Sequence, residues 1–246
     1  MNRSVSGAIV AACAVLLSGC AHSPESIAAN DPFEPMNRAV YKFDQRVDRS
    51  VVVPLAGIYF YYLPPPVHHG IHNVFTNLDL PVTFANDVLQ LRPVAAVSAL
   101  SRFVLNSSLG LGGLVDLATP AGIPYKPSDF GETLGRYGVP EGPFLVLPII
   151  GPDPPRDLAG DAVDVAMHPL FWLPPGAPFY EHALVSTAIH AGAPFEAHAT
   201  HIVLRQELEK GSVDPYVTMR SIYRQLRDED INGGVPDSKS NPPMPK

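Results

Sequence analysis

Nine histidines, a set of spaced carboxylates and one isolated cysteine are the residues whose chemistry could serve a catalytic or metal site. His198 and His201 stand three positions apart near Glu196, and this spacing puts both rings on one face of a helix. A zinc site needs at least three protein ligands. No third strong ligand is identifiable, so solvated histidines are the favoured interpretation, and we expect no metal and no cofactor. A further group shares another expected helix: His68, His69 and His72.

The spaced carboxylates are Asp157, Asp161 and Asp164, which lie at i, i+4 and i+7 and therefore share one face of an expected helix. A solvated face is the usual meaning of such spacing, and an acidic docking surface is the alternative. Charged residues of the opposite sign stand on the last expected helix, at Arg220, Arg224 and Arg227.

Sequence motifs of nucleophilic catalysis and nucleotide binding are missing. Neither a Gly-x-Ser-x-Gly elbow nor His-Glu-x-x-His is present. The run SLGLGGLVD at 108–116 follows a helical pattern rather than a strand, and Val115 stands where a dinucleotide loop needs its third glycine. We therefore expect no enzyme. A lipid hydrolase is kept as an alternative, and it would bring Ser107 or Ser108 beside a histidine in the folded chain.

Cys20 follows a segment with the features of an export signal. Arg3 gives a positive start, and the apolar residues 7–17 have the length of a signal core. They are too few for a membrane span, which needs roughly 20. The ending Leu17-Ser18-Gly19-Cys20 resembles the lipobox of bacterial lipoproteins. That resemblance implies cleavage before Cys20, a diacylglyceryl group on its sulfur and an acyl chain on its amino group; a plain secretory signal with an incidental cysteine is the alternative.

The charge balance excludes one broad class of partner. Cleavage removes only Arg3 among the charges, so the mature chain has 16 Lys and Arg against 24 Asp and Glu, a net charge of −8. Such a balance argues against nucleic acid and against simple attraction to anionic lipid. Charged residues make up only 17% of the chain, there are 28 prolines, and the mean hydropathy is +0.09. The protein must therefore place apolar surface somewhere other than in a spanning helix.

Four segments are expected: a signal peptide over 1–19, a lipidated polar tether over 20–30, one helical domain over 31–231 and a disordered tail over 232–246.

Proline is favoured in the first turn of a helix. Each Pro-Val pair, at 66–67, 81–82 and 93–94, is therefore expected to begin a helix. Other helices are expected at about 34–51, 129–137, 155–167, 178–193, 198–210 and 214–228, and residues 144–150 form a short strand or an apolar loop.

Two of these helices carry narrow polar stripes on otherwise apolar surfaces. The first stripe is Thr83, Asn86, Asp87 and Gln90, and the second is Ser98, Ser101, Arg102 and Asn106. A soluble surface helix shows the reverse, a limited apolar stripe and a broad polar face. Two interpretations stay open. These are core helices with satisfied polar residues, or their wide faces contact acyl chains while the stripes line a wet cavity.

Blocks of sequence covering nearly all of the body resemble the MlaA (VacJ) lipoprotein family, in the family's order. They are DPFEPMNRAVYKFDQRVDRSVVVPLA (31–56), IHNVFTNLDLPVTFANDVLQLRP (71–93), SRFVLNSSLGLGGLVDLA (101–118), DFGETLGRYGVPEGPFLVLPIIGP (129–152), the Arg156-Asp157 pair and DPYVTMRSIYRQLR (214–227). A small departure is PDPP at 152–155, where family members often carry Ser or Thr. It bears only on the shape of a local loop.

The resemblance implies a mainly α, single multi-helix ring of short, proline-punctuated amphipathic helices, embedded in the membrane interface. Its implied place is the periplasmic face of the outer membrane, which agrees with His22, rather than an inner-membrane retention Asp, after Cys20. The implied function is removal of mislocalised phospholipids from the outer leaflet through an amphipathic channel, which maintains lipid asymmetry. A periplasmic phospholipid carrier would receive them, and a trimeric porin is the implied neighbour.

Residues that could line this channel come from two sources. The polar stripes supply the eight residues named above, and the family block at 109–116 adds Gly110, Gly112 and Gly113. The alternative to transport is a structural envelope lipoprotein that uses its apolar faces only for packing, and it predicts a dry, filled centre.

Overall fold

The computed structural model describes residues 24–168, 195, 207 and 209–233, and this part is mainly helical, as the sequence predicts. Two-residue strands β1 (Val146–Leu147) and β2 (Gly151–Pro152) pair antiparallel. A π-helical turn η1 (Asp48–Val52) joins α3 to α4. The helices are α2 (Pro24–Ala28), α3 (Glu34–Val47), α4 (Val53–Tyr62), α5 (Pro65–Leu89), α6 (Pro93–Ser108), α7 (Phe130–Arg136), α8 (Pro155–Met167) and α11 (Pro215–Ile231).

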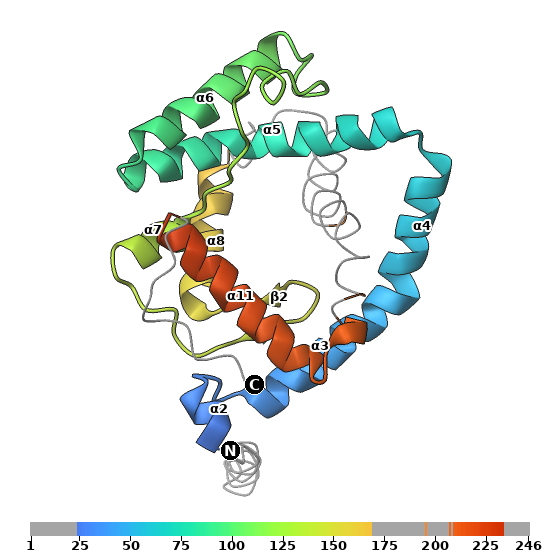
Figure 1. Cartoon of the computed structure of the whole chain (residues 1–246), viewed down its shortest axis with the longest axis vertical. Coiled ribbons are helices and arrows are strands. Elements are labelled where there is room, and N and C mark those ends of the chain that lie inside the picture. The colour runs from blue at the N-terminus through green and yellow to red at the C-terminus, as the bar shows by residue number, and fades with distance from the viewer. Residues whose placement is uncertain (1–23, 169–194, 196–206, 208, 234–246) are drawn as a thin grey trace, which may run out of the picture.

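The long helices follow one another around a ring (Figure 1). α3, η1 and α4 form one rod, and the chain axis turns by 120° between the end of this rod and α5. α6 packs along α5 on the outer side, α7 and α8 fill the next corner, and α11 returns towards α3. No single described helix is long and apolar enough to cross a bilayer. By length and composition alone, the rod and α5 together could do so as a bent pair.

Proline begins most of these helices, because its missing N–H needs no partner in the first turn. α5, α6, α8 and α11 each have proline at this position. The expected helix start at Pro81 is wrong, since Pro81 lies inside α5. Leu80 and Val82 on either side of it are buried, and this packing offsets the cost of about 3 kcal/mol for an interior proline.

Other helix predictions agree with the structure apart from their ends. The helix expected at 34–51 continues through η1 into α4 and ends at Tyr62. The ambiguous segment 144–150 contains the short strand β1. The helix expected at 178–193 and most of the one at 198–210 lie outside the described residues.

A buried polar cluster joins the two ends of the domain. Asp31 is completely buried, and its carboxylate accepts hydrogen bonds from the Tyr216 hydroxyl at 2.5 Å and from Asn37 Nδ2 at 2.8 Å. Arg220 of α11 contacts the same carboxylate at 2.5 Å. The Asn37 side chain also donates to Phe144 O at 2.9 Å, so the cluster holds the segment around β1 as well.

Two more arginines of α11 contact the part of the chain around α7 and α8. Arg224 contacts Glu141 at 2.8 Å, in the segment after α7. Arg227 contacts Asp129 at 2.5 Å, just before α7, and Asp157 of α8 at 2.9 Å. One face of α11 therefore reaches α7, α8 and the N-terminal segment.

The described part of the expected tether already packs on the domain. Pro24–Ala28 form α2, in which Ser26 is buried. Arg224 Nη1 donates to Ala29 O at 2.6 Å, and Asn30 O accepts from Phe144 N at 2.8 Å. Ordered packing thus begins before residue 31.

We predict that Asp31→Ala lowers the free energy of unfolding by about 3 kcal/mol, because it leaves the buried Tyr216 hydroxyl without its acceptor and the half-buried Arg220 guanidinium with only the more distant Glu34 at 3.6 Å. The measurement is thermal and denaturant unfolding of the detergent-solubilised protein, followed by circular dichroism. Glu25→Ala, which removes an exposed carboxylate from α2, is the control and should change stability by less than about 0.5 kcal/mol. Equal stability of the two variants would contradict a supporting role for the Asp31 cluster.

Candidate functional site

Many polar side chains are buried and many apolar side chains are exposed over the described part of the ring. Sixteen polar or charged residues are buried there, against nine apolar ones. Buried polar groups need hydrogen-bond partners, so the inward-facing residues must be joined to one another. The site is therefore built from these polar contacts and from the apolar surface that surrounds them.

The stripe on α5 meets α7 and α8. Asn86 is completely buried; its Nδ2 donates to Asp164 of α8 at 2.7 Å, and its Oδ1 accepts from the Thr133 hydroxyl of α7 at 2.9 Å. Gln90 Nε2 donates to the hydroxyls of Ser128 at 2.8 Å and Thr133 at 3.0 Å. The stripe thus fastens α5 to α7 and α8.

The stripe on α6 holds the loop that follows it. Arg102 is buried and contacts Asp116 at 2.9 Å, and it also donates to Ile123 O. Asn106 Nδ2 donates to Asp116 at 3.0 Å, while its Oδ1 accepts from the backbone N–H of Leu117 and Ala118. Asp116 accepts so many hydrogen bonds that its pKa falls to about 2, although burial acts in the opposite direction.

These contacts place the residues that we expected to line a channel. Thr83, Asn86, Asp87, Gln90, Arg102 and Asn106 are buried, whereas Ser98 and Ser101 are half-buried. The structure thus supports the first of the two open interpretations, polar residues satisfied by protein partners, for Asn86, Gln90, Arg102 and Asn106. For the second interpretation, part of the wide face of each helix is exposed, including Val88 and Leu89 on α5 and Val94, Val97 and Val104 on α6, whereas Val82 on α5 is buried. Channel lining by the stripes stays a prediction.

The three glycines shape the turn after α6. Gly113 has a φ of +95°, and a Cβ there would lie 2.6 Å from the Asn77 side chain of α5. Gly110 is equally crowded by the backbone of Asn106 and Val115, while Gly112, at a φ of +73°, faces open space. Close approach to α5 therefore explains Gly113, crowding by the backbone of α6 and of the turn itself explains Gly110, and backbone conformation explains Gly112.

The expectation of a solvated acidic face on α8 is wrong for two of its three residues. Asp157 is buried between Arg156, Arg227 and the Tyr223 hydroxyl, which donates to it at 2.6 Å. Asp164 accepts from Asn86 and from Phe130 N at 2.8 Å. Only Asp161 is exposed. The i, i+4, i+7 spacing identified a shared face correctly, but α7 and α11 cover it.

Three carboxyl groups near the contact between α7 and α8 have raised pKa values because of burial. The pKa of Glu132 rises to about 7, and neighbouring Asp129 adds to the shift. The pKa of Asp153 also rises to about 7, and that of Asp164 to about 6. Sequence reasoning missed Glu132, whose only signal was its place three residues after the N-cap Asp129.

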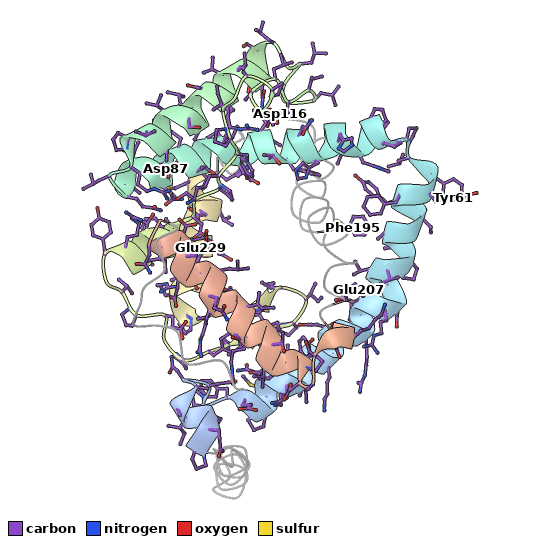
Figure 2. The ribbon with its side chains drawn as sticks, in the orientation of Figure 1. Tyr61, Asp87, Asp116, Phe195, Glu207 and Glu229 are labelled. Atoms are coloured by element: carbon purple, nitrogen blue, oxygen red, sulfur yellow. The ribbon has the colours of Figure 1, made fainter. Side chains whose placement is uncertain are left out.

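Many apolar side chains of the ring helices are exposed. Figure 2 shows Tyr61 pointing away from α4, while Phe195 lies inside the outline of the ring. The exposed apolar side chains of α4 and its neighbours α5 and α6 include Leu55, Ile58, Tyr62, Val88, Leu89, Val94, Val97, Leu100 and Val104. Exposed apolar surface of this extent marks a site of contact with a membrane or another protein.

A small open pocket lies between α3 and α11. Its volume is about 200 Å³, and its walls include Tyr41, Met219, Ile222 and Tyr223. This is below the roughly 300–1,000 Å³ of ordinary small-molecule sites, so we assign it no ligand.

Among the described residues, the candidate nucleophiles Ser107 and Ser108 are hydrogen-bonded to groups other than histidine. Asn77 donates to the Ser107 hydroxyl at 2.9 Å, and the Ser108 hydroxyl donates to Val104 O at 2.5 Å. The described ranges contain no group of three or more His, Cys, Asp or Glu placed to hold a metal ion. His198 and His201 lie outside the described residues.

Fold and site together define a mainly helical ring with polar contacts inside and an apolar exterior. A family model for the MlaA lipoprotein matches residues 29–230. The intermembrane phospholipid transport system lipoprotein MlaA of Haemophilus influenzae is 36% identical over 237 residues, which cover 94% of this chain and 92% of that protein. Its namesake in Escherichia coli K12 is 34% identical over 232 residues, covering 92% and 89%.

A solved structure from work on the structural basis for maintenance of bacterial outer membrane lipid asymmetry has the same fold. It superposes with a TM-score of 0.69 at 32% identity, covering 82% of this chain and 99% of that chain. This chain therefore belongs to the MlaA lipoprotein family, as its sequence blocks indicate.

The raised pKa values predict that the domain loses stability as the pH rises from about 4.5 to 7. In that range the folded state binds more protons than the unfolded state, so the free energy of unfolding falls with pH. Groups with a lowered pKa, such as Asp116, make stability depend on pH only below about pH 4. Glu132→Gln should flatten this dependence and raise stability at pH 8, as measured by denaturant unfolding at pH 5, 6, 7 and 8. Exposed Glu229→Gln is the control, and an unchanged pH profile in the Glu132 variant would refute the assignment.

Proposed function

We propose that this chain is an outer-membrane lipoprotein of a phospholipid transport system. It removes mislocalised phospholipids from the outer leaflet and passes them to a periplasmic carrier, which maintains lipid asymmetry. Acyl chains on Cys20 hold it to the periplasmic face of the membrane, because two or more chains anchor a protein stably. The names of its relatives support the transport role, and the chain acts without catalysis of its own.

The reversed polarity of the ring is the observation that carries this proposal. α4 contains no charged residue, yet many of its side chains are exposed. In water such a surface would be costly, whereas contact with acyl chains stabilises each fully buried Leu, Ile or Val by about 1.5–3 kcal/mol. The outside of the ring is therefore suited to the acyl layer of a leaflet.

Turn tips give a second indication of membrane contact. Leu91, Leu111 and Ile149 have φ values of 57°, 55° and 72°, a left-handed conformation that favours glycine and asparagine. Their side chains are nonetheless 81%, 73% and 70% exposed. Strain of about 1–3 kcal/mol at such positions persists where the surroundings require the side chain, and insertion of a Leu or Ile into lipid is such a requirement.

The polar interior is assigned to the wall of the proposed channel. Hydrogen bonds from Asn86 and Gln90 hold α5 to α8 and to Ser128, and those from Arg102 and Asn106 hold α6 to the Asp116 loop. Half-buried Ser98 and Ser101 are the stripe residues with most freedom to contact a passing headgroup. The receiving carrier and a neighbouring trimeric porin remain part of the proposal by family resemblance.

The two alternative functions, a structural lipoprotein and a lipid hydrolase, require different features of the structure. A structural envelope lipoprotein needs the apolar exterior but no transport. A lipid hydrolase needs a serine activated by histidine, and the described contacts of Ser107 and Ser108 are to Asn77 and a backbone carbonyl instead. The transport proposal accounts for both the exterior and the family.

Cells lacking the protein are expected to accumulate phospholipid in the outer leaflet, because the proposed exit for misplaced lipid is then missing. The measurement is outer-leaflet phospholipid labelled from outside intact cells. Add-back of the wild type should restore asymmetry, whereas Cys20→Ala should not, since it cannot be acylated. Cys13→Ala, a change within the expected signal peptide, is the matched control. An unchanged leaflet in the deletion strain would reject transport in favour of a structural role.

The proposed position in the membrane predicts that α6 contacts lipid. The acylated mature chain has no free thiol, because Cys13 is removed and Cys20 is modified, so a single introduced cysteine can be spin-labelled. In reconstituted vesicles a label at Val97→Cys on α6 should be relaxed by oxygen, which concentrates in the acyl layer. A label at exposed Glu229→Cys on α11 should be relaxed by a water-soluble nickel chelate. Nickel access at both positions would contradict lipid contact by α6.

A further inference from the structure

The rod formed by α3, η1 and α4 has a cationic stripe on its exposed side. Lys42, Arg46 and Arg49 lie at i, i+4 and i+7 and are all exposed. This spacing places them on one face of the helix. The chain as a whole is strongly acidic, with a net charge of −7, so three aligned cations are an exception to its composition.

These cations are largely free of protein partners. Neither Lys42 nor Arg46 has an ion pair among the residues that the structure describes. Arg49 lies 3.6 Å from Glu209, but its side chain is 69% exposed, and such a pair contributes little. No carboxylate is exposed between residues 34 and 52. The positive field of the stripe is therefore directed to solvent or to a partner.

An exposed apolar stripe runs beside the cationic one. Met36 and Phe43, also separated by seven residues, are about half exposed on the same helix. A helix with cations beside a partly apolar face is typical of the membrane interface, where the apolar side chains enter the acyl boundary and the cations meet headgroups. An acidic protein partner would explain the cations but gives no reason for Phe43 and Met36 beside them.

The second half of the rod fixes which part of the membrane each half meets. Residues 50–78 contain no Lys, Arg, Asp or Glu, so charge ends abruptly after Arg49. From Lys42 to Leu55 the helix rises about 20 Å at 1.5 Å per residue. The cations can therefore lie at the phosphate level while α4 lies in the acyl layer.

We propose that Lys42, Arg46 and Arg49 form a binding surface for the headgroups of anionic phospholipids in the leaflet that holds the ring. The proposal depends on the membrane seating argued above and adds a preference for charged headgroups. The net negative charge of the chain does not prevent it, because electrostatic interactions at physiological ionic strength are screened beyond about 8 Å. Each cation near an anionic surface contributes about a fivefold preference.

The test places a bimane fluorophore at Ala39→Cys, an exposed position three residues before Lys42. The full acylated protein is reconstituted into phosphatidylcholine vesicles that contain a nitroxide lipid with either a phosphatidylglycerol or a phosphatidylcholine headgroup. We expect half-maximal quenching at about a fivefold lower mole fraction of the glycerol lipid. The preference should disappear in Lys42→Gln/Arg46→Gln and weaken in 0.5 M NaCl. Lys126→Gln/Lys210→Gln, which removes two exposed cations elsewhere, should retain it.

Three outcomes would overturn the proposal. Equal quenching by both lipids in the wild type would show that α3 touches lipid without selecting charge. A preference that survives in Lys42→Gln/Arg46→Gln would assign it to other residues. Absence of quenching by either lipid would place this face away from the bilayer and favour a protein partner. The spin label at Val97 reports the seating of α6 independently, so failure of the headgroup surface is distinguishable from failure of the membrane proposal.

Discussion

The closed ring depends on the arginines of α11. Arg220, Arg224 and Arg227 lie on one helix face, and each contacts a carboxylate from a different part of the chain: Asp31 before α3, Glu141 after α7, and Asp129 with Asp157 at the start of α7 and α8. The described apolar core beside them is small, with Phe144, Val146 and Tyr216 at its centre. Charge-assisted hydrogen bonds are stronger than neutral ones. They therefore hold together an assembly whose buried apolar surface is limited.

In the proposed membrane seating, this use of polar contacts follows from the apolar solvent that the exterior faces. A protein in water buries its apolar residues because that transfer is its main source of stability. A ring seated in acyl chains gains little from burying Leu or Val inside, since the surroundings are equally apolar, and its polar groups are the ones that must find partners. Asn86, Asn106 and Arg102 show the result: each is buried and each joins a helix to a separate segment. The low content of charged residues fits the same proposal.

The sequence predicted much of this arrangement, and its failures have identifiable physical reasons. Helical spacing placed Asn86 and Gln90 on one stripe, and the same rule placed Asp157 and Asp164 on one face of α8; both groupings are correct. Spacing along one helix carries no information about which other helix covers a face, so the α8 face was wrongly expected to be solvated. Pro81 was misread for a similar reason, because the packing of Leu80 and Val82 overrides a local preference. The buried Asp31 cluster joins residues about 190 positions apart, and nothing in a single sequence pairs them.

Covalent geometry links the lipid anchor to the cationic face of α3. If Cys20 carries the acyl chains, Pro24 at the start of α2 is four positions further along, and an extended chain spans at most about 3.6 Å per residue. The start of α2 must then lie within about 14 Å of the Cys20 Cα. Asp31 N donates to Ser26 O of α2 at 2.8 Å, and the Asp31 carboxylate is held by Tyr216 and Arg220 of α11, so the beginning of α3 stays beside α2. In the proposed seating, the anchor, the cluster and the rod would together hold the start of α3 close to the membrane surface and leave the uncharged α4 to continue into the acyl layer.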